Sequence, residues 1–182
     1  MAEDVEAVVC AVQGMCTAGG FYFVNEADVV ICSSDATFFD SHVSTGLVSA
    51  LEPIGLMRRV GLGETLRIAL TGNDERVCAD TALRIGLVSE VVAPESLWSR
   101  AHEIATVIAA KPPAATQGTV KAIWESLDKP YRAALDHGLI YTRLATRSAR
   151  LNSRTPLRQH PYTEASLMHA TTADTAPAAT DR

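Results

Sequence analysis

VVCAVQGMCTAGGFYFV, residues 8–24, joins an apolar β-branched run to a glycine-containing turn and a second apolar run. The first run is typical of a buried strand, and we expect a helix over about residues 18–27. Glycine permits a positive φ and lets another group approach the backbone closely. The first N–H groups of a helix lack intrahelical partners and favour a negative oxygen in front of them. The turn therefore predicts either an anion or oxyanion site built from backbone amides or a closely packed connection without a ligand.

The residues that follow predict an α/β fold. VVIC, residues 29–32, is a second short β-branched run, so the chain opens with a βαβ unit whose strands are expected to be parallel. Residues 33–60 look mostly irregular, with a short helix within 50–59. We expect helices over 65–70 and 79–85 and a strand over 87–92. Three amphipathic helices are expected after this strand: one that begins at residue 94, a second that ends near residue 127, and a third over 131–151. In the second of these, Val120, Ile123, Trp124 and Leu127 are expected to face inward.

These patterns divide the chain into three parts. Residues 1–93 are expected to form a partial α/β core, residues 94–151 a helical region used for oligomerisation, and residues 152–182 a disordered tail rich in Ser, Thr, Pro and Ala.

Composition narrows the function classes. The chain has 182 residues, 47% of them hydrophobic, and a net charge of −5 with no basic block before residue 140, which argues against a nucleic-acid groove. No apolar run reaches the length of a membrane span, and the acidic start MAED lacks a signal-peptide pattern, so we expect a cytoplasmic protein without membrane partners.

The four cysteines, at positions 10, 16, 32 and 78, show no paired spacing and fit reduced thiols better than disulfides or zinc. Cys16 lies in the turn and is the one candidate nucleophile among them, although no partner histidine is near it in sequence. No histidine pair has metal-ligand spacing.

Three blocks resemble a known family. In order and at similar spacing, they resemble the signatures of the enoyl-CoA hydratase/isomerase (crotonase) superfamily. The first block is AVQGMCTAGG (residues 11–20), the second is ADVVI (27–31), and the third combines TG (71–72), RV (76–77) and ALRIGLV (82–88). The resemblance covers about residues 8–127. It implies a crotonase-like (ClpP/crotonase) core, an acyl-CoA thioester substrate, and no cofactor other than coenzyme A carried within that substrate. It also implies a homo-oligomer, a trimer or hexamer, formed through the C-terminal helices.

The resemblance also implies an oxyanion hole. In the family the glycine cluster supplies one of two N–H groups that hold the thioester oxygen as it becomes an enolate, and that role falls on Gly19. Losing one such donor typically costs about 2.7–4 kcal/mol of barrier. Met15, Gly20 and Tyr22 are assigned to substrate binding; for Tyr22 the alternative is packing.

Two further residues are candidates for proton transfer. The two glutamates of the family's hydratases fall at Tyr22 and His42 here, so hydration by that pair is not expected. His42 followed by Glu52 resembles instead the arrangement in relatives that hydrolyse carbon–carbon bonds. Imidazole suits proton transfer near neutrality, and Glu52 is expected to orient it. Ten residues on one helix give about 280° of rotation, so only a loop that folds back brings the pair together. The alternative is a solvated loop histidine and a helix-start glutamate.

The resemblance further implies an N-terminal truncation. Family members carry additional strands, much of the coenzyme A site and the second N–H donor ahead of the region matched here. A truncated gene, a start codon assigned too late, or a second chain that supplies the missing half would each account for this. The leading hypothesis is thus a family enzyme or fragment that acts on an acyl-CoA thioester. The alternative is a catalytically idle paralogue that associates with full-length relatives.

The hypothesis of dinucleotide binding is weak because no GxGxxG motif is present. Arg58 and Arg59 are candidate phosphate ligands or solvated surface residues.

Overall fold

The computed structural model describes residues 6–152, with side chains up to residue 143. The chain divides into a compact unit, residues 1–148, and a second unit, residues 149–182. The predicted tail beyond residue 152 lies outside the described residues. Over residues 6–152, no helix combines the length and apolar character needed to cross a membrane.

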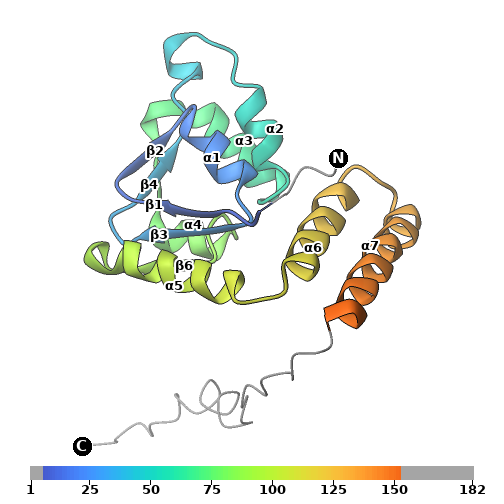
Figure 1. Cartoon of the computed structure of the whole chain (residues 1–182). Helices are drawn as coiled ribbons and strands as arrows, with labels where there is room; N and C mark the ends of the chain where they lie inside the picture. The colour runs from blue at the N-terminus through green and yellow to red at the C-terminus, as the bar shows by residue number, and fades with distance from the viewer. Residues whose placement is uncertain (1–5, 153–182) are drawn as a thin grey trace, which may run out of the picture. The chain divides into compact units, whose positions relative to one another are not determined.

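The first sheet is parallel, as the sequence predicts for the βαβ unit. Strands β1 (Val9–Val12), β3 (Val29–Ser33) and β6 (Glu90–Val92) lie in the order β1-β3-β6 (Figure 1). Val9 pairs with Val29 and Val12 with Cys32, and helix α1 (Gly20–Glu26) precedes β3 in the chain. The β6 strand begins at Glu90 rather than at residue 87. The N–H groups of Leu87 and Val88 donate to the carbonyl of Ala82 and close the preceding helix instead.

The predicted turn over residues 14–21 contains a strand that sequence reasoning missed. Gly14 has a φ of +66°, which turns the chain out of the first sheet. Its carbonyl accepts a hydrogen bond from the N–H of Thr37 at 2.8 Å. Residues Met15–Thr17 then form β2, which pairs in parallel with β4 (Thr37–Phe39); β4 pairs antiparallel with β5 (Val77–Cys78). The region expected to be irregular is therefore partly a second sheet.

The remaining elements are helical. They are η1 (Val43–Thr45), α2 (Leu51–Leu56), α3 (Leu62–Thr71), η2 (Gly72–Asp74), α4 (Ala79–Arg84), η3 (Pro94–Ser96), α5 (Leu97–Ala109), α6 (Pro113–Ser126) and α7 (Tyr131–Asn152). The predicted helices over 65–70, 79–85 and 131–151 are confirmed with small shifts at their ends.

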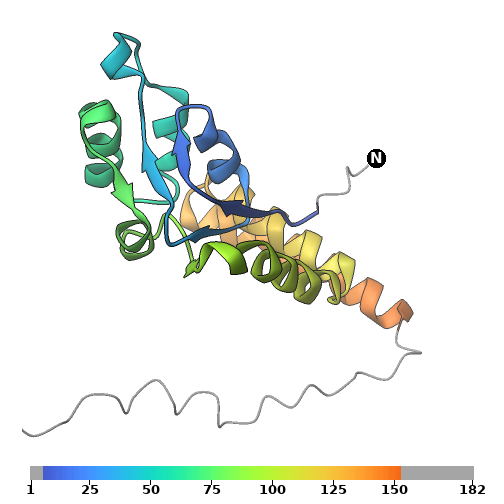
Figure 2. The same cartoon turned by 90° about the vertical axis from the view of Figure 1, so that its left-hand side faces the viewer.

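Successive side chains along β1 and β3 point to opposite faces of the sheet, and other elements cover both faces. Val9, Ala11, Val29 and Ile31 face Leu97 and Ala101 of α5. The residues between them, Cys10, Val12, Val30 and Cys32, join the main core with Phe21 and Val24 of α1, Phe38, Leu56, Ile68 and Leu87. Figure 2 shows α5 along one face of β1 and β3, with α1 on the other side. Burying a side chain such as Leu97, which is fully buried, contributes about 1.5–3 kcal/mol.

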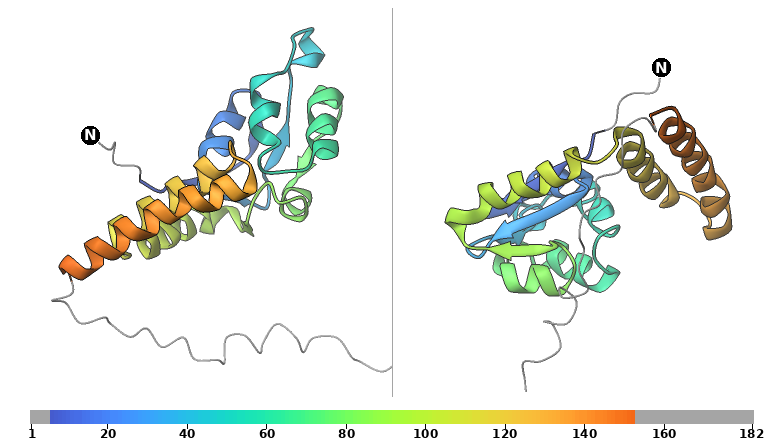
Figure 3. Two further views of the ribbon diagram at one scale, coloured as in Figure 1. Left: turned by 90° about the vertical axis from the view of Figure 1, so that its right-hand side faces the viewer. Right: turned by 60° about the horizontal axis from the view of Figure 1, so that its bottom comes forward.

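Helices α6 and α7 form a hairpin at the end of this unit (Figure 3). Glu125 on α6 accepts hydrogen bonds from Tyr141 at 2.6 Å and contacts the ring nitrogen Nε2 of His137 at 2.5 Å, both on α7. Trp124 Nε1 donates to Asp28 Oδ1 at 2.6 Å, and the N–H of Val8 donates to Asp28 Oδ2 at 2.7 Å. One carboxylate thus holds both the start of β1 and helix α6.

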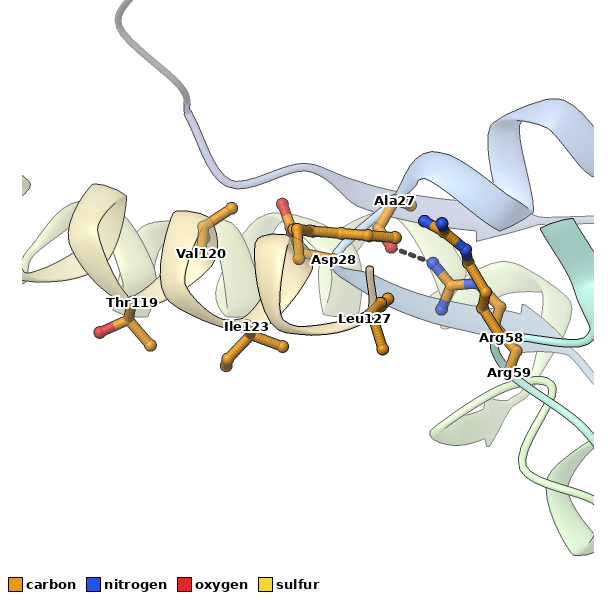
Figure 4. Close-up of a pocket in the computed structure, with 9 residues that line it drawn as sticks. Ala27, Asp28, Arg58, Arg59, Thr119, Val120, Ile123 and Leu127 are labelled. Carbon is orange, nitrogen blue, oxygen red and sulfur yellow. Dashed lines mark hydrogen bonds between the residues drawn. The ribbon is translucent and has the colours of Figure 1, made fainter. Parts of the chain in front are cut away.

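The apolar face of α6 is less buried than the sequence predicts. Ile123 is 60% exposed and Leu127 is 47% exposed. Together with Val120 and Trp124 they line an open cavity of about 280 Å³ beside Arg58 and Arg59 (Figure 4). Arg58 pairs with Asp128 at 2.5 Å, and Arg59 donates to the carbonyl of Asn25 in the last turn of α1 and to that of Ala27, its C-cap. Both arginines therefore have protein partners, and Arg59 acts as a C-terminal cap.

Candidate functional site

The turn between β2 and α1 presents an unpaired backbone amide. Among residues 6–152, the N–H of Gly19 has no hydrogen-bond acceptor, whereas the N–H groups of Phe21 and Tyr22 donate to the carbonyls of Ala18 and Gly19. Ala18 holds a φ of +46°, a left-handed conformation that is uncommon for a residue with a Cβ. A Cβ built on Gly19 meets no atom within 4 Å, so open space lies beside the Cα of this residue. Gly20 is more confined, because a Cβ there would lie 3.1 Å from the sulfur of Cys16.

His42 follows strand β4 and is bound to a buried aspartate. Its Nδ1 lies 2.6 Å from Oδ1 of Asp40, and its backbone N–H donates to the same oxygen at 3.0 Å. The other carboxylate oxygen, Oδ2, accepts a hydrogen bond from the hydroxyl of Ser49. Asp40 is only 1% exposed. Its carboxylate therefore satisfies its lone pairs inside the protein and fixes the orientation of the imidazole.

The contacts of this pair shift the pKa of both groups. Burial acts to raise the pKa of Asp40, but hydrogen bonds from Ser49 and from the N–H and ring of His42 hold it below its ordinary value. The hydrogen bond to Asp40 raises the pKa of His42, and the charges of Asp40 and Glu52 act in the same direction. The imidazole therefore carries its proton at Nδ1 toward Asp40 and presents Nε2 for proton exchange.

Glu52 lies on the other side of the imidazole. It occupies the first turn of α2 and is 8% exposed, and its Oε1 lies 3.9 Å from Nε2 of His42. The loop after His42 thus folds back and brings the two predicted residues together. The orienting contact that the sequence analysis expected from Glu52 is made by Asp40, at Nδ1.

Close packing of α1 against α2 sets the position of Glu52. Asn25 on α1 donates from Nδ2 to the carbonyl of Glu52 at 2.9 Å. Gly55, one turn further along α2, leaves the space that this contact needs, because a Cβ there would lie 2.5 Å from Nδ2 of Asn25.

The three predicted substrate-binding residues lie around the β2–α1 turn. Tyr22, 44% exposed, faces Glu52; partial desolvation, followed by the charge and hydrogen bond of Glu52, raises the pKa of its phenol. Met15 is 66% exposed on β2, where its sulfur contacts Nη1 of Arg76 at 3.3 Å. Gly20 begins α1.

Cys16, the candidate nucleophile, is buried in the core. Burial, and secondarily the neighbouring Cys10, raises the pKa of its thiol to about 12. A thiol in this state is a poor nucleophile at neutral pH.

Sequence reasoning missed Asp40 and Ser49. The signal for Asp40 was the order Asp40-Ser41-His42, since an aspartate side chain often accepts the N–H of the residue two positions later. For Ser49, seven residues beyond His42, no local pattern pointed to Asp40.

The two halves of the site lie at the same end of two parallel neighbouring strands, β2 and β4. Thr17 pairs with Phe39 at the carboxyl ends of these strands. Gly19 follows β2 by two residues, and Asp40 follows β4 directly. Ligand sites in such sheets lie beyond the carboxyl ends of the strands.

Comparison with known proteins identifies a family for this chain. The family model for enoyl-CoA hydratase/isomerase matches residues 3–152. The chain is 32% identical over 138 residues to an (E)-benzylidenesuccinyl-CoA hydratase from Thauera aromatica, covering 75% of this chain and 52% of that protein. It is 36% identical over 117 residues to a short-chain-enoyl-CoA hydratase from Clostridium acetobutylicum, covering 64% and 44%.

A solved structure shows the same fold. The crystal structure of an enoyl-CoA hydratase/isomerase from Mycobacterium paratuberculosis aligns with a TM-score of 0.77 at 36% identity, over 85% of this chain and 61% of that one. The chain spans about half the length of the curated relatives it matches. The predicted crotonase-like α/β fold is confirmed, and the chain belongs to the enoyl-CoA hydratase/isomerase family.

Proposed function

We propose that this protein acts on an acyl-CoA thioester through an enolate-type intermediate, with the N–H of Gly19 as one donor to the thioester oxygen. The observation that carries this proposal is the pairing of β2 with β4. It brings the free amide of Gly19 and the oriented imidazole of His42 to the same end of two neighbouring strands. An amide donor at the developing oxyanion and a proton-transfer group nearby are the two elements that enolate chemistry needs.

In this proposal His42 moves the proton. Asp40 holds Nδ1, so Nε2 exchanges a proton with the substrate carbon or with an attacking water. Glu52, 3.9 Å from Nε2, shares that proton rather than orienting the ring. Tyr22 donates a hydrogen bond beside Glu52, and Met15 and Gly20 border the thioester. The proposal covers reactions of the hydratase, isomerase or carbon–carbon hydrolase type, although Tyr22 and His42 replace the glutamate pair of the family's hydratases.

The test is binding and turnover of coenzyme A thioesters by the purified chain. Saturated, α,β-unsaturated and β-keto acyl-CoA thioesters are titrated by calorimetry, and turnover is followed by thioester absorbance. We expect at least one class to bind, and His42→Ala to lower its turnover by roughly 10²–10⁴-fold, the range of general acid–base catalysis. His102→Ala is the matched control, since His102 is exposed on α5.

Two results would contradict the proposal. Unchanged turnover in His42→Ala removes that residue from the reaction. If no thioester binds, the idle paralogue that associates with full-length relatives becomes the better account.

We also propose a homo-oligomer formed through the C-terminal helices. Leu135 and Leu139 on α7 are 54% and 52% exposed, as is much of the apolar face of α6. Sedimentation of the purified chain tests this, and a monomer at micromolar concentration would contradict it.

A further inference from the structure

We propose that Ser49 is a positioning residue for His42: its hydroxyl holds Oδ2 of the buried Asp40 carboxylate and thereby limits how tightly Oδ1 holds the proton on Nδ1. This inference rests on the proposed function only in giving His42 a proton to move. The contacts themselves are independent of the substrate.

The carboxylate of Asp40 has few alternatives to this hydroxyl. Oδ1 serves the backbone N–H and the ring of His42, and Oδ2 accepts from Ser49. Because Asp40 is 1% exposed, water does not replace a lost donor easily. A buried carboxylate that loses one donor holds the protons it shares with its remaining partners more tightly.

The loop that carries Ser49 is itself anchored on His42. The carbonyl of His42 accepts hydrogen bonds from the N–H groups of Thr45 and Leu47, each at 3.0 Å, and from the hydroxyl of Thr45 at 2.8 Å. Residues 42–47 are thereby held in a compact turn, and the chain returns to Asp40 at Ser49. The side chain of Val48, next to Ser49, is 88% exposed.

The expected sign follows from the groups around the imidazole. Two carboxylates face the imidazole of His42: Asp40, which follows β4, and Glu52, which lies on α2. Tyr22 on α1 faces Glu52 in turn. When the hydroxyl of Ser49 is removed, the carboxylate loses one competing donor. The carboxylate of Asp40 then holds a proton more tightly, and this includes the proton that it shares with Nδ1 of His42. The titration midpoint of His42 therefore moves to higher pH.

The experiment is an NMR titration of the His42 ring in the full chain, assigned with His42→Gln. We expect Ser49→Ala to move the midpoint upward and Ser49→Thr, which keeps the hydroxyl, to leave it in place. Ser44→Ala is the matched control, because Ser44 lies on the same loop but bonds to the N–H of Asn73. In an Asp40→Asn background the Ser49→Ala shift is expected to vanish, as a double-mutant cycle requires for an effect that passes through Asp40.

For a thioester that the chain turns over, Ser49→Ala is expected to lower kcat on the acid side roughly tenfold, about 1.4 kcal/mol, with KM unchanged. A midpoint that stays or moves downward in a folded Ser49→Ala protein overturns this inference, whatever the activity. A shift that persists in the Asp40→Asn background also overturns it. Unchanged turnover in His42→Ala overturns the proposed function instead, so the two failures are distinguishable.

Discussion

Nδ1 of His42 lies 2.6 Å from Oδ1 of Asp40, only two residues earlier in the chain. The same oxygen accepts the backbone N–H of His42, so one aspartate fixes both the main chain and the ring of the residue that follows it. A histidine held in this way has one tautomer and one orientation, which is the condition for directed proton transfer.

Replacing Asp40 by Asn tests this contact. The amide keeps the shape of the side chain but removes its charge, so the pKa of His42 should fall toward its ordinary value and turnover should fall by roughly a hundredfold or more. The midpoint of the His42 NMR titration and the pH profile of kcat measure the two effects. Asp74→Asn, at an exposed position in η2, is the control. A His42 midpoint that does not fall would contradict the role of Asp40.

Proline at position 19 removes the amide hydrogen of Gly19. Gly19 has a φ of −55°, close to that of proline, and a Cβ there meets nothing within 4 Å. Gly19→Pro should therefore lower turnover by roughly a hundred- to thousandfold through loss of the donor. Gly19→Ala keeps the N–H and should retain most activity. Equal losses in the two variants, measured under identical conditions on folded protein, would show that the amide is not the important group.

Gly55→Ala is expected to separate α1 from α2. The new Cβ would lie 2.5 Å from Nδ2 of Asn25, so the variant should lose about 1–3 kcal/mol of unfolding free energy. Urea denaturation measures the loss. Gly63→Ala on α3, where a Cβ meets nothing within 4 Å, should be neutral or stabilising by up to about 1 kcal/mol. Equal stability of the two variants would contradict the close packing at Gly55.

Asp40 should also make stability depend on pH. Its pKa is lower in the folded than in the unfolded chain, so its contribution is fully present above the unfolded-state value, near 4. This contribution is lost as the pH falls through the folded-state value. The difference in unfolding free energy between the wild-type chain and Asp40→Asn should therefore narrow on acidification below about pH 4. A difference that is constant between pH 7 and pH 3 would contradict this.

His42 acts in the opposite direction. Its folded-state pKa is raised, so its contribution is present below the unfolded-state value and disappears as the pH rises through the folded-state value.

The parallel βαβ unit was predictable from residues 8–32, because short β-branched runs on either side of a glycine turn have few other solutions. The second sheet was not. Strand β2 has only three residues, Met15–Thr17, and nothing in that short sequence shows that Gly14 redirects the chain toward β4.

The site divides in the same way. The positions of Gly19 and His42 followed from local patterns and from family resemblance. Asp40 and Ser49 depend on a loop that returns over nine residues, and on hydrogen bonds that no sequence periodicity encodes. The exposure of Ile123 and Leu127 could not be foreseen either, because an amphipathic pattern does not say which surface covers it.

The carboxylate of Asp28 accepts hydrogen bonds from the N–H of Val8 and from the indole N–H of Trp124, which lie near opposite ends of the described chain. Fraying of the first strand and detachment of the helical hairpin are thereby linked in a single opening event. Amide exchange at Val8 and the fluorescence of Trp124 should report that event with the same free energy.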